Sequence, residues 1–300
     1  MRFTAFNNNI SSLAFITVIS FAIASCTGGE ESKETAEDFK IDSAAASALQ
    51  VGNVVFCIPS PIQTAVLIKD VGANYSKEML NSTKNINSYS TNYLKSLNLG
   101  IYGADLGYST IYEQPQDGIK YLKAVEGLAD DIGVSGAFSI ETMKRITDNL
   151  GNQDSLLTMV ADCYRSANAF LQNNDRDDAC SLILAGGWIE SLYFVTQIAG
   201  SMTNQEIINR IGEQKSTLNN LIKLIEPHYN QPEFRELLDQ LIDLAYEFDE
   251  VEVKYTFVQP TVDVDKQLSI INSTSEVIIT AEQIKNISEK IKLIREQIVG

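Results

Sequence analysis

Hydrophobic residues recur three and four positions apart through most of the chain after residue 60. This spacing places apolar side chains on one face of a helix, and short polar turns separate successive segments. The pattern predicts helices over 60–72, 76–83, 88–98, 99–112, 116–133, 139–150, 153–174, 178–200, 204–226 and 233–248, and a last helix that begins near Val264 or Ser275. We therefore expect an all-α fold, a multi-helix up-and-down bundle.

The segment 178–200 is apolar on nearly every side, which is typical of a buried central helix. It nevertheless contains Gly186 and Gly187, and each glycine in a helix costs about 1 kcal/mol relative to alanine. A close packing contact or a bend is the expected reason for keeping them.

The segment 99–112 contains Gly100, Gly103 and Gly107 at spacings of three and four. On a helix they form a smooth stripe against which a second helix packs closely. The alternative is a ligand-facing aromatic surface, because three tyrosines lie beside the stripe: Tyr102, Tyr108 and Tyr112.

One stretch departs from helical spacing. Residues 250–259 alternate apolar and polar side chains, as a strand does, and Pro260 ends the alternation. Because no partner strand is evident, an extended linker is the other interpretation. We place a sub-boundary of the domain near 250–262.

The N-terminus has the pattern of a bacterial lipoprotein signal peptide. Arg2 is the only charged residue among the first 25, and an apolar run of about a dozen residues follows it, too short to span a bilayer. Ile23-Ala24-Ser25-Cys26 matches the lipobox, in which the cysteine thiol accepts diacylglycerol and further acyl chains such as palmitate join it. An ordinary cleaved signal and an uncleaved anchor are the alternatives.

These patterns divide the chain into three parts. Residues 1–25 are the expected signal peptide, 26–50 an acidic, flexible and disordered tether, and 51–300 the helical domain. Acyl chains on Cys26 would hold the domain on the outer membrane. Acidic residues soon after Cys26 loosely resemble a surface-export signal, so the periplasmic face and the cell surface both stay open.

The charge limits the partners. The net charge is −16, and removal of Arg2 with the signal peptide makes it −17. Such a chain is not expected to bind nucleic acid, and anionic lipid surfaces repel it. The membrane reached through the lipid and another envelope protein are the expected partners.

The sequence lacks the familiar catalytic and metal motifs. His228 is the only histidine, which excludes HExxH zinc sites, and neither a P-loop nor a G-x-S-x-G elbow occurs. The Asp-rich segment 173–178 fails as an EF-hand loop, so helix capping is preferred there. We predict no catalytic residues, no metal site and no cofactor. Cys57, Cys163 and Cys180 leave both free thiols and one disulfide open.

Three stretches together resemble a family of uncharacterised, mostly helical lipoproteins of the Bacteroidota. They are Ile58-Pro59-Ser60-Pro61, the run 98–106 and the run 186–193. The resemblance implies an envelope location and a helical fold, and it brings no assigned site. The polar and aromatic positions within these runs are the candidate ligand or partner contacts: Tyr102, Asp105, Trp188, Glu190 and Tyr193.

The expected function is therefore a membrane-anchored lipoprotein whose helical domain binds or scaffolds another envelope component without catalysis. One alternative is a binder of a small or polymeric ligand in an aromatic pocket formed by Tyr102, Tyr108, Trp188 and Tyr193. Another is a hydrolase that uses the carboxylates of Asp105, Asp130 and Glu190.

Overall fold

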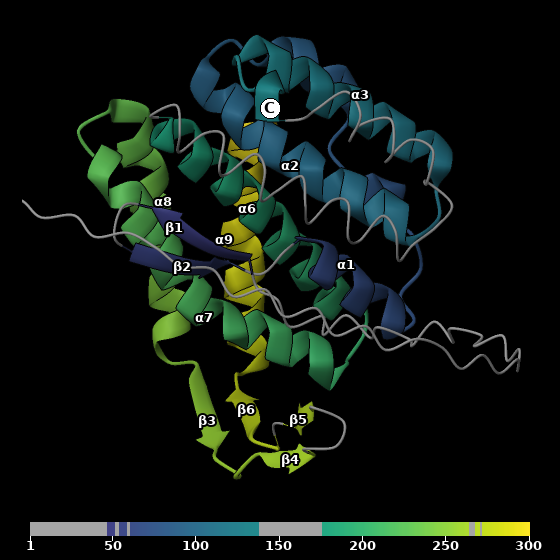
Figure 1. Cartoon of the computed structure of the whole chain (residues 1–300), viewed down its shortest axis with the longest axis vertical. Helices are drawn as coiled ribbons and strands as arrows, with labels where there is room; N and C mark the ends of the chain where they lie inside the picture. Colours follow the sequence, from purple (N-terminus) through teal and green to yellow (C-terminus); the bar gives the residue numbers. More distant parts are fainter. Residues whose placement is uncertain (1–46, 52–53, 59–60, 138–175, 264–267, 271) are drawn as a thin grey trace, which may run out of the picture. The chain divides into compact units, whose positions relative to one another are not determined.

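A computed structural model describes residues 47–51, 54–58, 61–137, 176–263, 268–270 and 272–300 (Figure 1). The chain divides into two compact units, Met1–Ile41 and Asp42–Gly300, and all described residues belong to the second. The signal peptide, Cys26, most of the expected tether and the helices predicted at 139–150 and 153–174 lie outside the described residues.

The second unit is a bundle of packed helices, which confirms the predicted all-α fold class (Figure 1). Its described α-helices are α1 (Pro61–Asp70), α2 (Asn92–Ile111), α3 (Pro115–Asp131), α6 (Asp177–Ser201), α7 (Gln205–Ile225), α8 (Pro232–Asp249) and α9 (Ala281–Val299). The described part of the chain also contains four short 3₁₀ turns, Lys77–Met79, Thr83–Ser88, Ser135–Ala137 and Glu226–His228.

Helix α6 is the core of the bundle. It packs against α1, α2, α7 and α9, and most of its side chains are buried. By length and composition it is the one described helix that could cross a membrane, but 94% of its most apolar stretch is buried inside the unit. Since its apolar faces are covered by other helices, α6 has the environment of a core helix, as its all-round apolar pattern predicts.

Three helix predictions differ from the structure. The helix expected over 76–83 is wrong, because only the 3₁₀ turn Lys77–Met79 forms there and the backbone is extended at Ser76 and Leu80 on either side of it. Most of the segments 88–98 and 99–112 forms one helix, α2, which begins at Asn92, because Gly100 near its middle is buried in a helix contact instead of breaking it. The last helix begins at Ala281 and not near Val264 or Ser275. Thr280 and Gln283 form a capping box there, in which each side chain bonds the other residue's backbone N–H.

The strands among the described residues form three antiparallel pairs. β1 (Ser47–Val51) pairs with β2 (Val54–Ile58), so residues 47–50 of the segment expected to be a disordered tether belong to a strand. β3 (Glu252–Thr256) pairs with β6 (Thr274–Ile278), and β4 (Thr261–Asp263) pairs with β5 (Leu268–Ile270) between them. The linker interpretation of 250–259 is therefore wrong, because β6 supplies the missing partner strand.

We call the described residues of 252–278 the arm. It leaves the helices beside α7 (Figure 1). At its base Val277 is buried against Gly212 of α7, where a side chain on residue 212 would overlap the valine. The helix and the arm therefore approach closely at Gly212.

Candidate functional site

The crossing of α2 and α6 positions the candidate residues. A side chain at Gly100 would overlap the Ile183 carbonyl oxygen, and one at Gly186 would overlap the Leu97 carbonyl oxygen. Glycine at both positions therefore lets the two backbones touch. This contact confirms the interpretation of the α6 glycines and of Gly100 as packing residues.

A buried ion pair lies beside this crossing. Glu190 of α6 accepts two hydrogen bonds from Arg295 of α9, Nε to Oε2 at 2.5 Å and Nη2 to Oε1 at 2.7 Å. Arg295 Nη2 also donates to the Met79 carbonyl oxygen at 3.0 Å. The guanidinium lies 4.3 Å from the ring centre of Tyr193, in a cation–π contact. The pair therefore joins α6, α9 and the loop before α2.

Asp105 of α2 continues the cluster. Its Oδ2 accepts from the backbone N–H of Asn81 at 3.2 Å, and its carboxyl group interacts directly with that of Glu190. The Asn81 side chain donates to the Tyr89 hydroxyl at 2.9 Å and to Asn98 Oδ1 at 3.1 Å. These polar groups form one continuous network inside the bundle.

Tyr102 belongs to the same network. Its hydroxyl donates to the Ser82 carbonyl oxygen at 2.9 Å and lies 3.3 Å from the Tyr89 hydroxyl. Burial raises the pKa of Tyr102, so the phenol stays neutral. A neutral, doubly engaged phenol is a structural group and has no free face for a ligand.

Trp188 is separate from the cluster. Its indole N–H donates to Gln214 Oε1 of α7 at 2.9 Å, and the side chain is 2% exposed. The indole thus joins α6 to α7. The fifth candidate does not meet the other four.

Tyr108, the remaining residue of the predicted aromatic pocket, is also internal. Its ring is 5.0 Å from that of Phe194 and 4.7 Å from that of Tyr112, and its hydroxyl accepts from the Ser76 backbone N–H at 3.1 Å. The tyrosines beside the glycine stripe therefore fill the core around α2.

The structure thus brings together four of the five candidates, but inside the protein. Tyr102, Asp105 and Glu190 are 0% exposed, and Tyr193 is half-buried. A partner could reach Tyr102, Asp105 and Glu190 only if helices separated, whereas the Tyr193 side chain is partly exposed. That these residues contact a ligand or partner therefore stays a prediction. They form a buried polar core that joins α2, α6 and α9.

The sequence reasoning missed Arg295, the cation of the cluster. One signal was available, because Arg295 stands four residues after Ile291 on the apolar seam of α9, where a side chain turns inward. A charged residue at such a position needs a buried partner of opposite charge. The glutamate within the apolar helix α6 was the obvious candidate.

The three carboxylates of the hydrolase alternative do not come together, because only Asp105 and Glu190 meet. Asp130 is exposed on α3, whereas Asp105 and Glu190 are buried. His228 packs against Phe234, with ring centres 5.0 Å apart. Within the described ranges, no three His, Cys, Asp or Glu side chains are grouped closely enough to hold a metal ion. Cys180 is buried, while Cys163 and the Cys57 side chain are not described.

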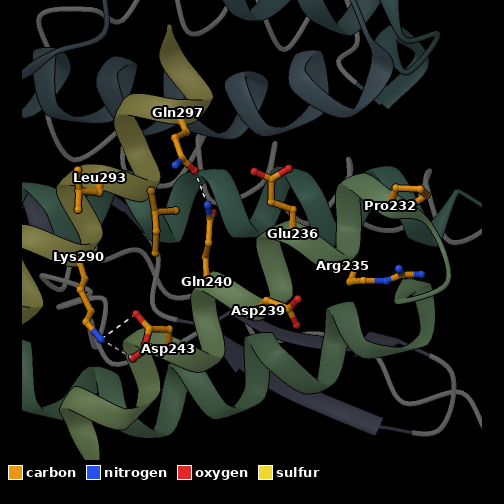
Figure 2. A pocket seen from close by; sticks show the side chains of 10 residues that line it. Pro232, Arg235, Glu236, Asp239, Gln240, Asp243, Lys290, Leu293 and Gln297 are labelled. Carbon is orange, nitrogen blue, oxygen red and sulfur yellow. Dashed lines mark hydrogen bonds and ion pairs between the residues drawn. The ribbon is translucent and has the colours of Figure 1, made fainter.

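A groove of about 590 Å³ lies between α8 and α9 (Figure 2). Side chains bridge it: Lys290 Nζ lies 2.8 Å from Asp243 Oδ2, and Gln240 donates to Gln297. Leu293 is its one strongly exposed apolar side chain, and none of the five candidate residues lines it. The groove is open, and most of its lining residues are charged or carry an amide.

Comparison of the chain with protein-family models, with curated proteins and with solved structures found no match.

Proposed function

We propose that the protein is a bacterial envelope lipoprotein, of the helical Bacteroidota kind that its motifs resemble, held on the outer membrane through an acylated Cys26. Its helical domain binds another envelope protein and does not itself catalyse a reaction. The lipobox at Cys26 supports the location. The arm supports the binding role.

The arm carries an unusual share of the exposed hydrophobic surface. Of the eleven large hydrophobic side chains exposed among the described residues, seven belong to it: Val253, Tyr255, Phe257, Val258, Val262, Ile270 and Ile278. Large exposed apolar patches are rare on monomers and mark interaction surfaces. This concentration is the observation that carries the proposed function.

The geometry of the arm favours an extended segment of a partner protein. Tyr255 and Phe257 are 64% and 69% exposed. They continue the face of the arm to which Val253 and its partner Val277 belong, because alternate residues of a strand share a face. Within the described residues β3 pairs only with β6, so its other edge is open to a further strand. An added strand would form backbone hydrogen bonds and cover both aromatic rings. The acidity of the chain disfavours an anionic membrane as occupant.

The test compares two variants by crosslinking and pull-down from native membranes. We expect the Tyr255→Ser/Phe257→Ser variant to recover at least tenfold less of a partner protein that the wild type recovers reproducibly. Tyr246→Ser is the matched control, because Tyr246 is equally exposed, at 66%, but lies on α8. It should recover the partner at the wild-type level.

Three outcomes would contradict the proposed binding role. They are equal recovery by the arm variant, arm-dependent binding to lipid vesicles without protein, and arm-dependent self-association of the purified chain. Mass spectrometry of the native protein tests the anchor separately. An unacylated Cys26, or a leader cleaved elsewhere, would overturn the location.

A further inference from the structure

Asp105 has an oxygen atom without a hydrogen-bond donor. Its side chain is completely buried; Oδ2 accepts from the Asn81 backbone N–H, but Oδ1 has no donor within the described part of the chain. Such a buried acceptor is costly when it carries charge. The carboxyl group that it interacts with is that of Glu190, which as a carboxylate has no proton to give.

The charges of the cluster do not balance if both acids are ionised. Arg295 is the single cation facing Asp105 and Glu190 among the described residues, and it gives two N–H groups to Glu190 and one interaction to the Met79 carbonyl. Full ionisation would leave one net negative charge buried, with two carboxylates against each other.

The other titratable neighbours supply no positive charge. The groups that respond to the charge of Asp105 are phenols from the elements around it: Tyr89 before α2, Tyr102 on α2, Tyr121 on α3 and Tyr193 on α6. Neutral phenols cannot compensate a second carboxylate. A proton on Asp105 Oδ1, donated to Glu190, removes the excess charge and satisfies both oxygens.

We infer that the folded protein keeps Asp105 as a neutral carboxylic acid that donates a hydrogen bond to the Glu190 carboxylate, and that loss of this proton loosens α9 from α2 and α6 at alkaline pH. Burial, and next the charge of Glu190, raise the pKa of Asp105 well above its usual range, which agrees with this geometry. The inference is independent of the proposed function.

The direction of the pH effect follows from linkage. The unfolded chain releases the Asp105 proton near pH ~4, whereas the folded chain keeps it to higher pH. The stability contributed by the protonated acid is complete below pH ~4. It falls as pH rises toward the folded-state pKa, about tenfold in the unfolding equilibrium constant per pH unit.

Denaturant unfolding of the full chain between pH 5 and pH 8 tests this. Asp105→Asn keeps the shape and a donor but cannot ionise, so the ratio of the wild-type to the variant unfolding constant should rise by up to tenfold per pH unit. Asp130→Asn, at an exposed site on α3, should give a curve parallel to wild type. Hydrogen exchange should locate the alkaline loosening in α9.

A constant ratio across this range would overturn the inference. If Asp105→Asn does not fold, a measurement on the wild-type protein tests whether Asp105 is protonated. With isotope-labelled aspartate, its infrared spectrum at pH 7 should contain the carbonyl band of a protonated acid. The absence of that band would show that Asp105 is ionised, and alkaline hydrogen exchange that spares α9 would overturn the second half of the inference.

Discussion

Single residues at the α2–α6 crossing set how closely the two central helices approach. Gly186 faces the Leu97 carbonyl oxygen, and a methyl group there would overlap it. Backbone atoms cannot move aside as a flexible side chain can, so the helices would have to separate.

We therefore expect Gly186→Ala to destabilise the protein by about 2–4 kcal/mol, because overpacking against backbone propagates along both helices. Gly200→Ala is the matched control on the same helix, since its methyl group would meet nothing within 4 Å. It should be neutral or stabilising by up to about 1 kcal/mol. Urea unfolding measures both, and equal stability of the two variants would refute the close contact.

Asp117 gives a second residue-scale prediction, at acidic pH. Its carboxylate accepts from Lys77 Nζ at 2.6 Å, from Lys120 Nζ at 3.0 Å and from the Tyr75 hydroxyl at 3.1 Å. The Lys77 hydrogen bond is the main reason that its pKa falls to about 2. A lowered folded-state pKa gives stability that is complete above the unfolded value of ~3.9 and is lost as pH falls through about 2.

Asp117→Asn should therefore cost about 1 kcal/mol at neutral pH, the modest value typical of partly exposed ion pairs. Below pH ~5 its stability should fall less steeply than that of the wild type. Parallel unfolding curves of variant and wild type from pH 7 to pH 3 would show that this ion pair does not contribute.

At the scale of elements, α9 is attached to the core through its last turn. Asn98 of α2 donates to the Ile298 carbonyl oxygen at 3.0 Å, and Asn85 donates to that of Val299 at 3.3 Å. Arg295 adds the ion pair with Glu190 in the same turn. The carbonyl groups at a helix end lack partners within the helix, so side chains of other elements satisfy them here.

Asn98→Ala should thus destabilise the protein by about 2 kcal/mol, because it leaves buried polar groups unpaired. Hydrogen exchange should speed up first in the last turn of α9. Asn286→Ala removes the half-buried bond between α9 and Glu247 of α8 and should cost less than about 1 kcal/mol. If the two substitutions cost the same, the last turn is not the main attachment.

At the scale of the whole molecule, the described unit combines a tightly packed helical body with an arm whose large apolar side chains are mostly exposed. Tyr255 and Phe257 are exposed, whereas Val277 at the base is buried. Folding therefore depends on the residue at the base of the arm, whereas the proposed partner binding depends on its exposed residues.

The free energy of unfolding of the Tyr255→Ser/Phe257→Ser variant should equal that of the wild type within about 0.5 kcal/mol, because exposed side chains contribute little to stability. Val277→Ala should cost about 1–2 kcal/mol, since it removes buried methyl groups at the contact with α7. Thermal unfolding of the two variants checks this. If the Tyr255→Ser/Phe257→Ser variant were destabilised and Val277→Ala were not, the two aromatic rings would pack against the helical body and would not be exposed.

The sequence determined the local part of this architecture. Helical spacing identified the bounds of α6 and α8 within one or two residues. The all-round apolar pattern of α6 identified it as the core helix, because the apolar faces of a helix can be recognised from its own residues alone. The glycines of α2 and α6 likewise predicted a close helix contact. The alternation at 250–259 predicted a strand, but not its partner β6, which begins 18 residues after β3 ends.

Only the tertiary structure decided which polar groups meet and which surface stays open. Glu190 and Arg295 are 105 residues apart in the chain, and Asn98 and Ile298 are 200 apart. Pairing over such separations depends on how helices pack, and hydrophobic periodicity carries no information about that choice. The motifs around Asp105 and Glu190 attracted attention as a candidate contact site, yet packing made them a buried polar core, while the exposed face of β3 emerged because the ribbon extends beyond α7.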